Sequence, residues 1–255
     1  MAGAYTGGPR AVVDIEAITR SEARALAATE NERIINLLES LSDDDWSKPT
    51  DCTAWDVRSV AGHVVGAVEG FSSYGRLVHL MYAARKEARG GSFVDGMTAV
   101  QVRERATLTN RELIARLRDA TPKSVHFRSQ MPSPLRAMPM KQELLSGATE
   151  RWTMGYLLDT ILTRDNWMHR VDITRATDRA MVLTPGHDGR IVADAVAEWA
   201  RRHDKPFTLE LTGVAGGTFF GGAGGESITL DALEFCRILS GRTAGTGLLT
   251  QEVPF

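Results

Sequence analysis

The segment that most constrains this protein reads Thr163-Arg164-Asp165-Asn166-Trp167-Met168-His169-Arg170-Val171-Asp172. Its surroundings predict a helix over 149–176, on which Asp165 and His169, four positions apart, point the same way. The side chains that share this face are Met154, Leu158, Ile161, Leu162 and Asp172. A carboxylate and an imidazole buried on an apolar face are costly unless they are paired or bind a metal. The spacing therefore leaves two interpretations open, a buried Asp–His hydrogen bond and a metal site.

His63 is the third candidate ligand, at the border of the aliphatic stripe of a second predicted helix. The residues stacked over it, Gly66, Ala67 and Gly70, either let a neighbouring helix pack closely or leave a pocket above the histidine. Together, His63, Asp165 and His169 form a set of two histidines and one carboxylate. Three protein ligands leave one position open, which is the arrangement of a catalytic zinc site and not of a closed structural one.

Apolar residues at helical spacing predict four long helices, over 15–41, 54 into the 80s, 98–120 and 149–176. Thr53 and Asp56 resemble a capping box at the start of the second. The proline-containing segment 122–139 is expected to be irregular. The predicted fold class is mainly α, with a four-helix bundle.

The pattern changes near Thr184-Pro185-Gly186. A helix is expected over 188–202, an alternating strand over 207–211, a glycine-rich hairpin or loops over 213–225, a short strand over 228–230 and a last helix over 231–239. The predicted domains are therefore a bundle, 1–180, and a small α+β domain, 181–255. The second is too small to build a large core alone, so we expect it to dock against the bundle.

The composition of the chain limits the classes of partner that we expect it to bind. The chain has 255 residues, 43% hydrophobic and 24% charged, with a net charge of −2. This content of hydrophobic and charged residues is typical of a globular protein. The basic residues do not outnumber the acidic ones, which argues against nucleic acid as the main partner. No apolar run is long enough to span a membrane, and no signal core precedes Arg10. Two cysteines, Cys52 and Cys236, fit a reducing compartment. We expect a cytoplasmic monomer or homodimer whose partners are small molecules.

Three segments resemble one known family. Cys52-Thr53-Ala54-Trp55-Asp56-Val57-Arg58-Ser59-Val60-Ala61-Gly62-His63-Val64 resembles the opening of the second helix in DinB-like proteins, and more narrowly in the mycothiol-dependent maleylpyruvate isomerase family. Asp165, Trp167, His169 and Asp172 match the pattern of that family's fourth helix, and the tail 228–255 is similar to its carboxyl-terminal domain. Ala54 and Ser59 depart from the opening motif, and Asp165 stands where the family commonly has Glu.

The resemblance implies a DinB-like bundle whose His63, Asp165 and His169 hold zinc or another divalent metal. It further implies mycothiol as a thiol cosubstrate, which attacks a small electrophile in S-transfer or isomerisation. Zinc at an open site favours the thiolate, the nucleophilic form. Neither cysteine of the chain has the basic neighbours of a nucleophile, so the reactive sulfur should come from the cosubstrate. Two other functions are a DinB-type metal-dependent hydrolase that uses a metal-bound water, and a non-catalytic metal-binding protein.

Three further residues have two interpretations each. Arg242 matches the family's carboxyl-terminal arginine, which the resemblance implicates in holding an acidic group of substrate or thiol. The alternative interpretation is that Ser240-Gly241-Arg242 merely caps the last helix with glycine. Asp172 either orients His169 or pairs with a neighbouring arginine. Trp55 is expected to be a packing residue and not a substrate contact.

Overall fold

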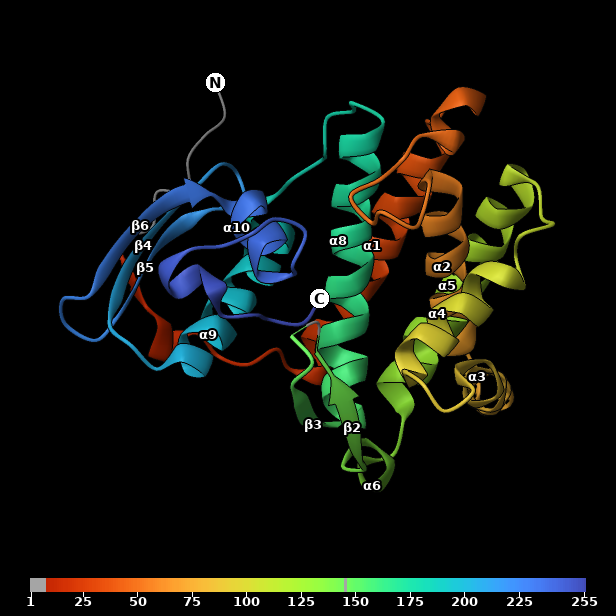
Figure 1. The fold of residues 1–255 in the computed structure, drawn as a ribbon, viewed down its shortest axis with the longest axis horizontal. Helices are drawn as coiled ribbons and strands as arrows, with labels where there is room; N and C mark the ends of the chain where they lie inside the picture. The colour runs from red at the N-terminus through yellow and green to blue at the C-terminus, as the bar shows by residue number, and fades with distance from the viewer. Residues whose placement is uncertain (1–7, 145) are drawn as a thin grey trace. The chain divides into compact units, whose positions relative to one another are not determined.

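The computed structural model describes residues 8–144 and 146–255, which form two compact units (Figure 1). One unit comprises Thr19–Glu143 and Thr149–Met181, and the described part of the other comprises 8–18, 144, 146–148 and Val182–Phe255. The predicted division assigned 8–18 to the bundle. The structure instead groups this segment with the carboxyl-terminal unit, because strand β1 (Arg10–Ala11) pairs in parallel with β5 (Gly217–Gly221) of that unit.

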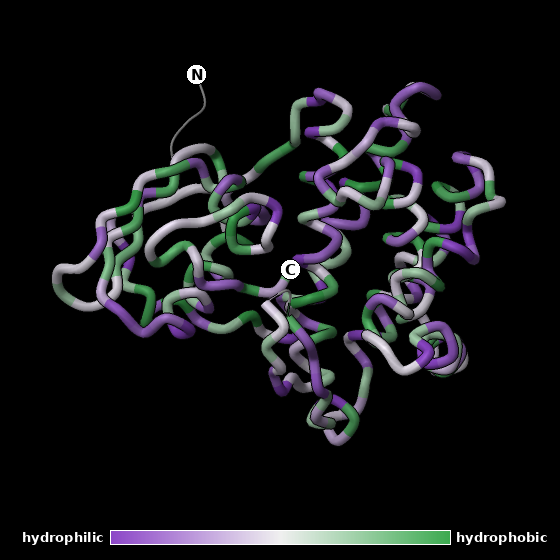
Figure 2. Tube along the Cα trace, in the orientation of Figure 1, coloured by the Kyte–Doolittle hydropathy of each residue, from purple (hydrophilic) through white to green (hydrophobic). Residues whose placement is uncertain are grey.

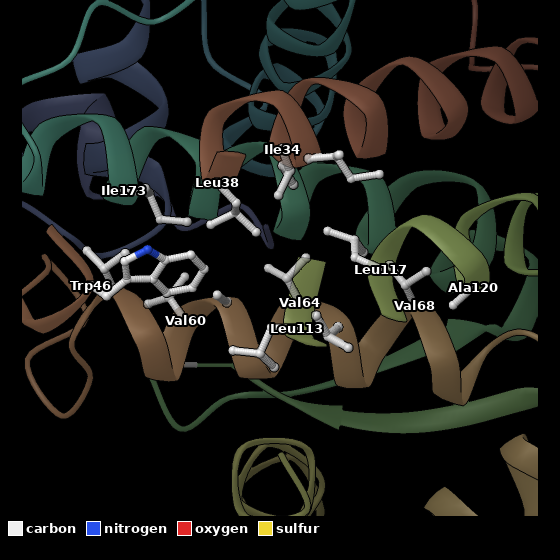
Figure 3. Close-up of a cluster of buried hydrophobic side chains, with 14 residues drawn as sticks. Ile34, Leu38, Trp46, Val60, Val64, Val68, Leu113, Leu117, Ala120 and Ile173 are labelled. Carbon is white, nitrogen blue, oxygen red and sulfur yellow. The ribbon is translucent and has the colours of Figure 1, made fainter. Parts of the chain in front are cut away.

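Four long helices build the first unit: α1 (Arg20–Glu39), α2 (Val57–Gly70), α5 (Asn110–Gln130) and α8 (Leu162–Ala176). Helices α1 and α2 each pack against both α5 and α8, so the four close into a bundle. Apolar side chains from these helices, together with Trp46 from the connection between α1 and α2, meet in one buried cluster (Figure 3). Its members are Ile34, Ile35, Leu38, Trp46, Val57, Val60, Ala61, Val64, Val65, Val68, Leu113, Leu117, Ala120 and Ile173. The predicted four-helix bundle and mainly α class are confirmed.

The predicted second helix is two helices, α2 and α3 (Tyr74–Ala88). Helix α2 ends at Gly70, and Ser73 begins the next helix by accepting the Arg76 N–H on its hydroxyl. The predicted capping box is also wrong, because Asp56 itself is the cap of α2 and accepts the Ser59 N–H at 2.8 Å. Short polar side chains commonly satisfy the free N–H groups of a first turn in this way.

The predicted third helix is likewise two helices, α4 (Phe93–Arg103) and α5. Helix α5 begins after Thr109 and runs through Pro122 to Gln130, so the expected irregular segment is wrong over its first part. A proline inside a helix costs about 3 kcal/mol. The buried stripe of α5 continues on both sides of Pro122, and its packing against α1 maintains the helix.

The predicted helix over 149–176 is preceded by a hairpin. Strand β3 (Thr149–Thr153) pairs antiparallel with β2 (Pro139–Glu143), and helix α6 (Ser133–Arg136) comes before them. The helix begins only at Met154, where the Thr153 hydroxyl accepts the Tyr156 N–H. It then continues as α7 (Met154–Tyr156), a π-helical turn η3 (Leu157–Ile161) and α8.

The second unit is a four-stranded sheet with two helices. Strands β4 (Phe207–Thr212) and β6 (Glu226–Asp231) complete the order β1-β5-β4-β6, in which β4 is antiparallel to β5 and parallel to β6. Phe207 contacts Trp199 of α9 (Arg190–His203), and Trp199 contacts Phe235 of α10 (Ala232–Leu239). Both helices therefore pack on the face of the sheet that β4 buries, and the predicted α+β character is confirmed.

Short helical turns occupy several connections of the two units. They are η1 (Val12–Asp14), η2 (Asp43–Ser47), η4 (Pro185–Gly189) and η5 (Gly247–Thr250). Apolar residues alternate with polar ones along the trace of both units (Figure 2). Within the described ranges, no helix is both long and apolar enough to cross a membrane.

Candidate metal centre

Helices α2 and α8 bring the three predicted ligands together inside the bundle. Nε2 of His63 lies 3.2 Å from Oδ2 of Asp165, and Nε2 of His169 lies 3.4 Å from Oδ1 of the same carboxylate. The two imidazole rings meet edge to face, with centroids 4.9 Å apart. One ligand atom of each residue thus lies within 4.8 Å of the other two. Two residues from one helix and one from its neighbour form a single cluster.

The small residues of α2 allow neighbouring helices to pack closely. A Cβ at Gly66 would lie 2.5 Å from Cβ of Gln101 on α4, and one at Gly70 would lie 2.5 Å from Leu80 on α3. Gly66 therefore has no room for a side chain, because backbone Cα of Gln101 would also lie within 2.9 Å, whereas at Gly70 the clash is with the end of the Leu80 side chain. Of the two roles open from the sequence, close helix packing is the one that the structure displays.

A second carboxylate contacts the centre through His169. Nδ1 of His169 lies 2.9 Å from Oδ2 of Asp172, whose side chain is fully buried. A neutral imidazole that donates from Nδ1 carries its lone pair on Nε2, the atom that faces Asp165. The sequence also allowed Asp172 to pair with a neighbouring arginine. Of these arginines, Arg170 pairs with Glu30 at 2.6 Å and Arg175 pairs with Asp51 at 3.1 Å. Asp172 is thus placed to orient His169.

The cluster strongly favours opposite charges on Asp165 and His169. Burial disfavours ionisation of Asp165, but the nearby His169 and His63 outweigh this effect and hold the pKa of the carboxyl well below its usual value. Burial likewise disfavours the imidazolium of His169, yet Asp165 and the hydrogen bonds of Asp165, Asp172 and Cys52 raise its pKa well above its usual value. Without a metal, the preferred state is a carboxylate beside an imidazolium, so a cation has to displace a proton.

The loop before α2 covers the centre with two residues to which the sequence interpretation gave no role in the site. Sγ of Cys52 lies 3.4 Å from Oδ2 of Asp172. The indole ring of Trp55 lies 5.0 Å from the ring of His63 and 6.1 Å from that of His169, between centroids. Both residues are adjacent in sequence to the helix that bears His63, but only the fold brings them to α8. The one sequence feature that could have indicated a role in the site is that Cys52 and Trp55 belong to the same motif as His63.

Comparison with known proteins gives the family. The family model described as the mycothiol maleylpyruvate isomerase N-terminal domain matches residues 27–174, more than half of the chain. The chain belongs to this family. The predicted family is therefore confirmed, and the match contains all three candidate ligands of the centre. A comparison with curated proteins finds no significant match.

Two solved structures share the fold of this family member. One is the mycothiol-dependent maleylpyruvate isomerase, with a TM-score of 0.57, and the other is a histidine-to-alanine mutant of that isomerase, with a TM-score of 0.55. Each is 14% identical in sequence, and each alignment covers 92% of this chain and 92% of the other. The likeness extends beyond the residues matched by the family model, and at this identity it shows the fold alone.

The donor atoms of the centre fit a divalent metal such as zinc. Zinc binds histidine nitrogen and carboxylate oxygen at about 2.0–2.1 Å, so two ligands of a tetrahedral site lie about 3.3 Å apart. The separations of 3.2 Å from His63 to Oδ2 of Asp165 and of 3.4 Å from His169 to Oδ1 are each close to this spacing. The Asp165 side chain is 22% exposed, against 6% for either histidine, so the cluster is reached from its carboxylate side. The residues therefore suit a metal that keeps an open position.

Arg242 belongs to the other unit of this family member. The Arg242 N–H donates to the Arg237 carbonyl at 2.9 Å, and the Gly241 N–H donates to Ile238 at 3.0 Å. Gly241 has a φ of 76°, and the two bonds form the Schellman motif that ends α10. The backbone at Arg242 thus has the capping role considered from the sequence. A further role of its guanidinium stays a prediction.

Proposed function

We propose that this protein is a cytoplasmic, mycothiol-dependent metalloenzyme, an S-transferase or an isomerase of small electrophiles. His63, Asp165 and His169 would hold its divalent metal, with zinc the expected ion. One observation carries the proposal: two histidines and one carboxylate from α2 and α8 converge, with one ligand atom of each within 4.8 Å of the others, on the domain that defines the family. The name of the structurally similar isomerase supports mycothiol as the thiol.

The charge of the ligand set suits a thiol cosubstrate. Two neutral imidazoles and one carboxylate contribute a charge of −1, so the set leaves a divalent ion with a net charge of +1. An ion of this kind acts as a Lewis acid that lowers the pKa of a thiol and favours the thiolate. Asp172, bonded to Nδ1 of His169, would keep the proton of the neutral ligand on Nδ1 and leave Nε2 free to bind the metal.

The nucleophilic sulfur is expected to come from outside the chain. Cys236 is fully buried in the other unit, and the Cys52 thiol lies beside the buried Asp172 carboxylate. In both proposed reactions the thiol sulfur attacks carbon. Addition to a double bond, followed by bond rotation and loss of the thiol, gives isomerisation, whereas displacement of a leaving group gives S-transfer.

The test is metal analysis of the purified protein, followed by assays of small electrophiles with and without mycothiol. Asp165→Ala serves as the metal-deficient control, and cysteine at the same concentration is a control for thiol identity. We expect one metal ion per chain and turnover that requires both the metal and mycothiol. Metal-dependent turnover without any thiol would instead indicate a hydrolase. A protein that binds no metal would exclude the proposal.

A further inference from the structure

The two histidines of the centre are oriented by different means. Nδ1 of His169 is fixed by the Asp172 carboxylate, at 2.9 Å. Nδ1 of His63 is buried and has no hydrogen-bond partner within residues 8–144 and 146–255. Metal-binding histidines almost always donate their second nitrogen to an acceptor that fixes the ring. Some other contact therefore has to orient the imidazole of His63.

The indole ring of Trp55 makes that contact. Its centroid lies 5.0 Å from that of the His63 ring, and the two planes are inclined by 33°. The His169 ring is farther away, at 6.1 Å, and is inclined by 46°. Tilted, offset ring pairs at 4.5–7 Å attract one another beyond the area that they bury. The indole thus packs more closely on the imidazole that lacks a hydrogen-bond acceptor.

The loop that carries Trp55 is braced within itself. The Trp55 N–H donates to the Cys52 carbonyl at 2.7 Å, and the Trp55 carbonyl accepts from the N–H and the hydroxyl of Thr50, at 3.2 and 2.8 Å. The Val57 N–H donates to the Lys48 carbonyl at 3.0 Å, which closes the loop at the start of α2. These bonds fix the backbone on both sides of the indole.

The same loop is fastened to α8 at two points. Asp51 pairs with Arg175 at 3.1 Å, and Sγ of Cys52 lies 3.4 Å from Oδ2 of Asp172. The loop thus links the helix of His63 to the helix of Asp165 and His169. An indole on such a support can restrain a ring that packs against it.

We propose that Trp55 is a positioning residue for the metal centre, whose indole holds the His63 imidazole with Nε2 towards Asp165. It replaces the hydrogen-bond acceptor that His169 has in Asp172. This inference rests on the proposed metal role of His63, Asp165 and His169. A different role for Trp55 is packing alone, because its side chain also contacts the apolar core.

The test is the zinc affinity of metal-free, full-length protein, measured by competition with a chromophoric chelator. Trp55→Phe keeps an aromatic face, whereas Trp55→Leu keeps only apolar bulk. We expect Trp55→Leu to bind zinc roughly tenfold more weakly, the low end of the effect of losing an orienting partner. Trp55→Phe should stay within about threefold of the parent. The d–d absorption of cobalt bound in place of zinc should change in the Leu variant and be recovered in the Phe variant.

Trp46→Leu is the matched control, because Trp46 belongs to the same apolar core but has no ring contact with either histidine in the described residues. It should lower the melting temperature and leave zinc affinity unchanged. Equal zinc affinity of Trp55→Leu and the parent would overturn the inference, and so would an equal loss in Trp46→Leu. If the parent bound no zinc, both this inference and the proposed function would fail. A parent that binds zinc but ignores mycothiol would overturn only the proposed function.

Discussion

The fully buried carboxylate of Asp172 lies 2.9 Å from Nδ1 of His169 and directs the other nitrogen of that imidazole towards Asp165. An amide at position 172 could still accept the hydrogen bond but would lack the charge. We therefore predict that Asp172→Asn weakens zinc binding about 10- to 100-fold, the usual effect of losing such a partner. Chelator competition measures this change. Asp119→Asn, at an exposed carboxylate paired with Lys123, is the control and should bind like the parent.

His63→Ala and His169→Ala should each abolish stoichiometric metal binding, because each removes one of only three protein ligands. Helix content should remain close to that of the parent, since neither histidine is a member of the apolar core of the bundle. Elemental analysis of dialysed protein and far-ultraviolet circular dichroism give the two measurements. A variant that retains one tightly bound zinc per chain would show that its histidine is not a ligand.

Asp165→Glu should retain metal, whereas Asp165→Ala should lose most of it. The longer carboxylate matches the residue that the family commonly has at this position, and the partly exposed side chain has room on its solvent side. Metal content and zinc affinity of the two variants are the readouts. The opposite order, with metal kept by Ala and lost by Glu, would exclude Asp165 as a ligand.

Stability of the metal-free protein should depend on pH through Asp165 and His169. The pKa of His169 is raised above its usual 6.5, so its contribution to folding is complete below pH 6.5 and is lost as the pH rises through the raised value. The pKa of Asp165 is lowered from 3.8, so its contribution is complete above pH 3.8 and is lost only as the pH falls towards the lowered value. The melting temperature should therefore decline as the pH is raised above 6.5.

Zinc should reverse this trend, because a metal ligand has to be deprotonated and protons compete with the ion. At saturating zinc, the melting temperature should rise over the interval in which that of the metal-free protein declines. His169→Gln, which cannot titrate, should flatten the decline. If metal-free parent and His169→Gln had the same pH profile, the pair of Asp165 and His169 would not be its source.

Arg242→Lys and Arg242→Ala should lower thiol-dependent turnover without changing metal content. Arginine can hold a carboxylate through two parallel hydrogen bonds, which lysine cannot reproduce. Gly241→Ala is the matched control, because it strains the left-handed residue of the cap and leaves the guanidinium in place. It should reduce stability more than turnover. Full activity of both Arg242 variants would leave Arg242 with its capping role alone.

Much of the bundle follows from local patterns in the sequence. The stripes of α1, α2 and α8 have the helical period, and alternation along 207–211 predicts β4 with one buried face. The positions at which helices end were harder to predict. Phe71 to Ser73 separates two amphipathic segments by a short turn, so the pattern over 54–88 looks continuous. At Pro122 the opposite error arose, since local propensity predicts an end and packing of α5 against α1 maintains the helix.

The family and the candidate ligands could be predicted from local sequence, because a spacing of four residues places Asp165 and His169 on one helix face and the motif around His63 is local. Which atoms meet depends on the fold. The separations between His63 and Asp165, and between Cys52 and Asp172, join residues more than 100 positions apart. The stacking of Trp55 on His63 likewise depends on a loop closed by its own hydrogen bonds and fastened to α8. Contacts of this kind are set by how helices pack, and no local pattern encodes the packing of distant helices.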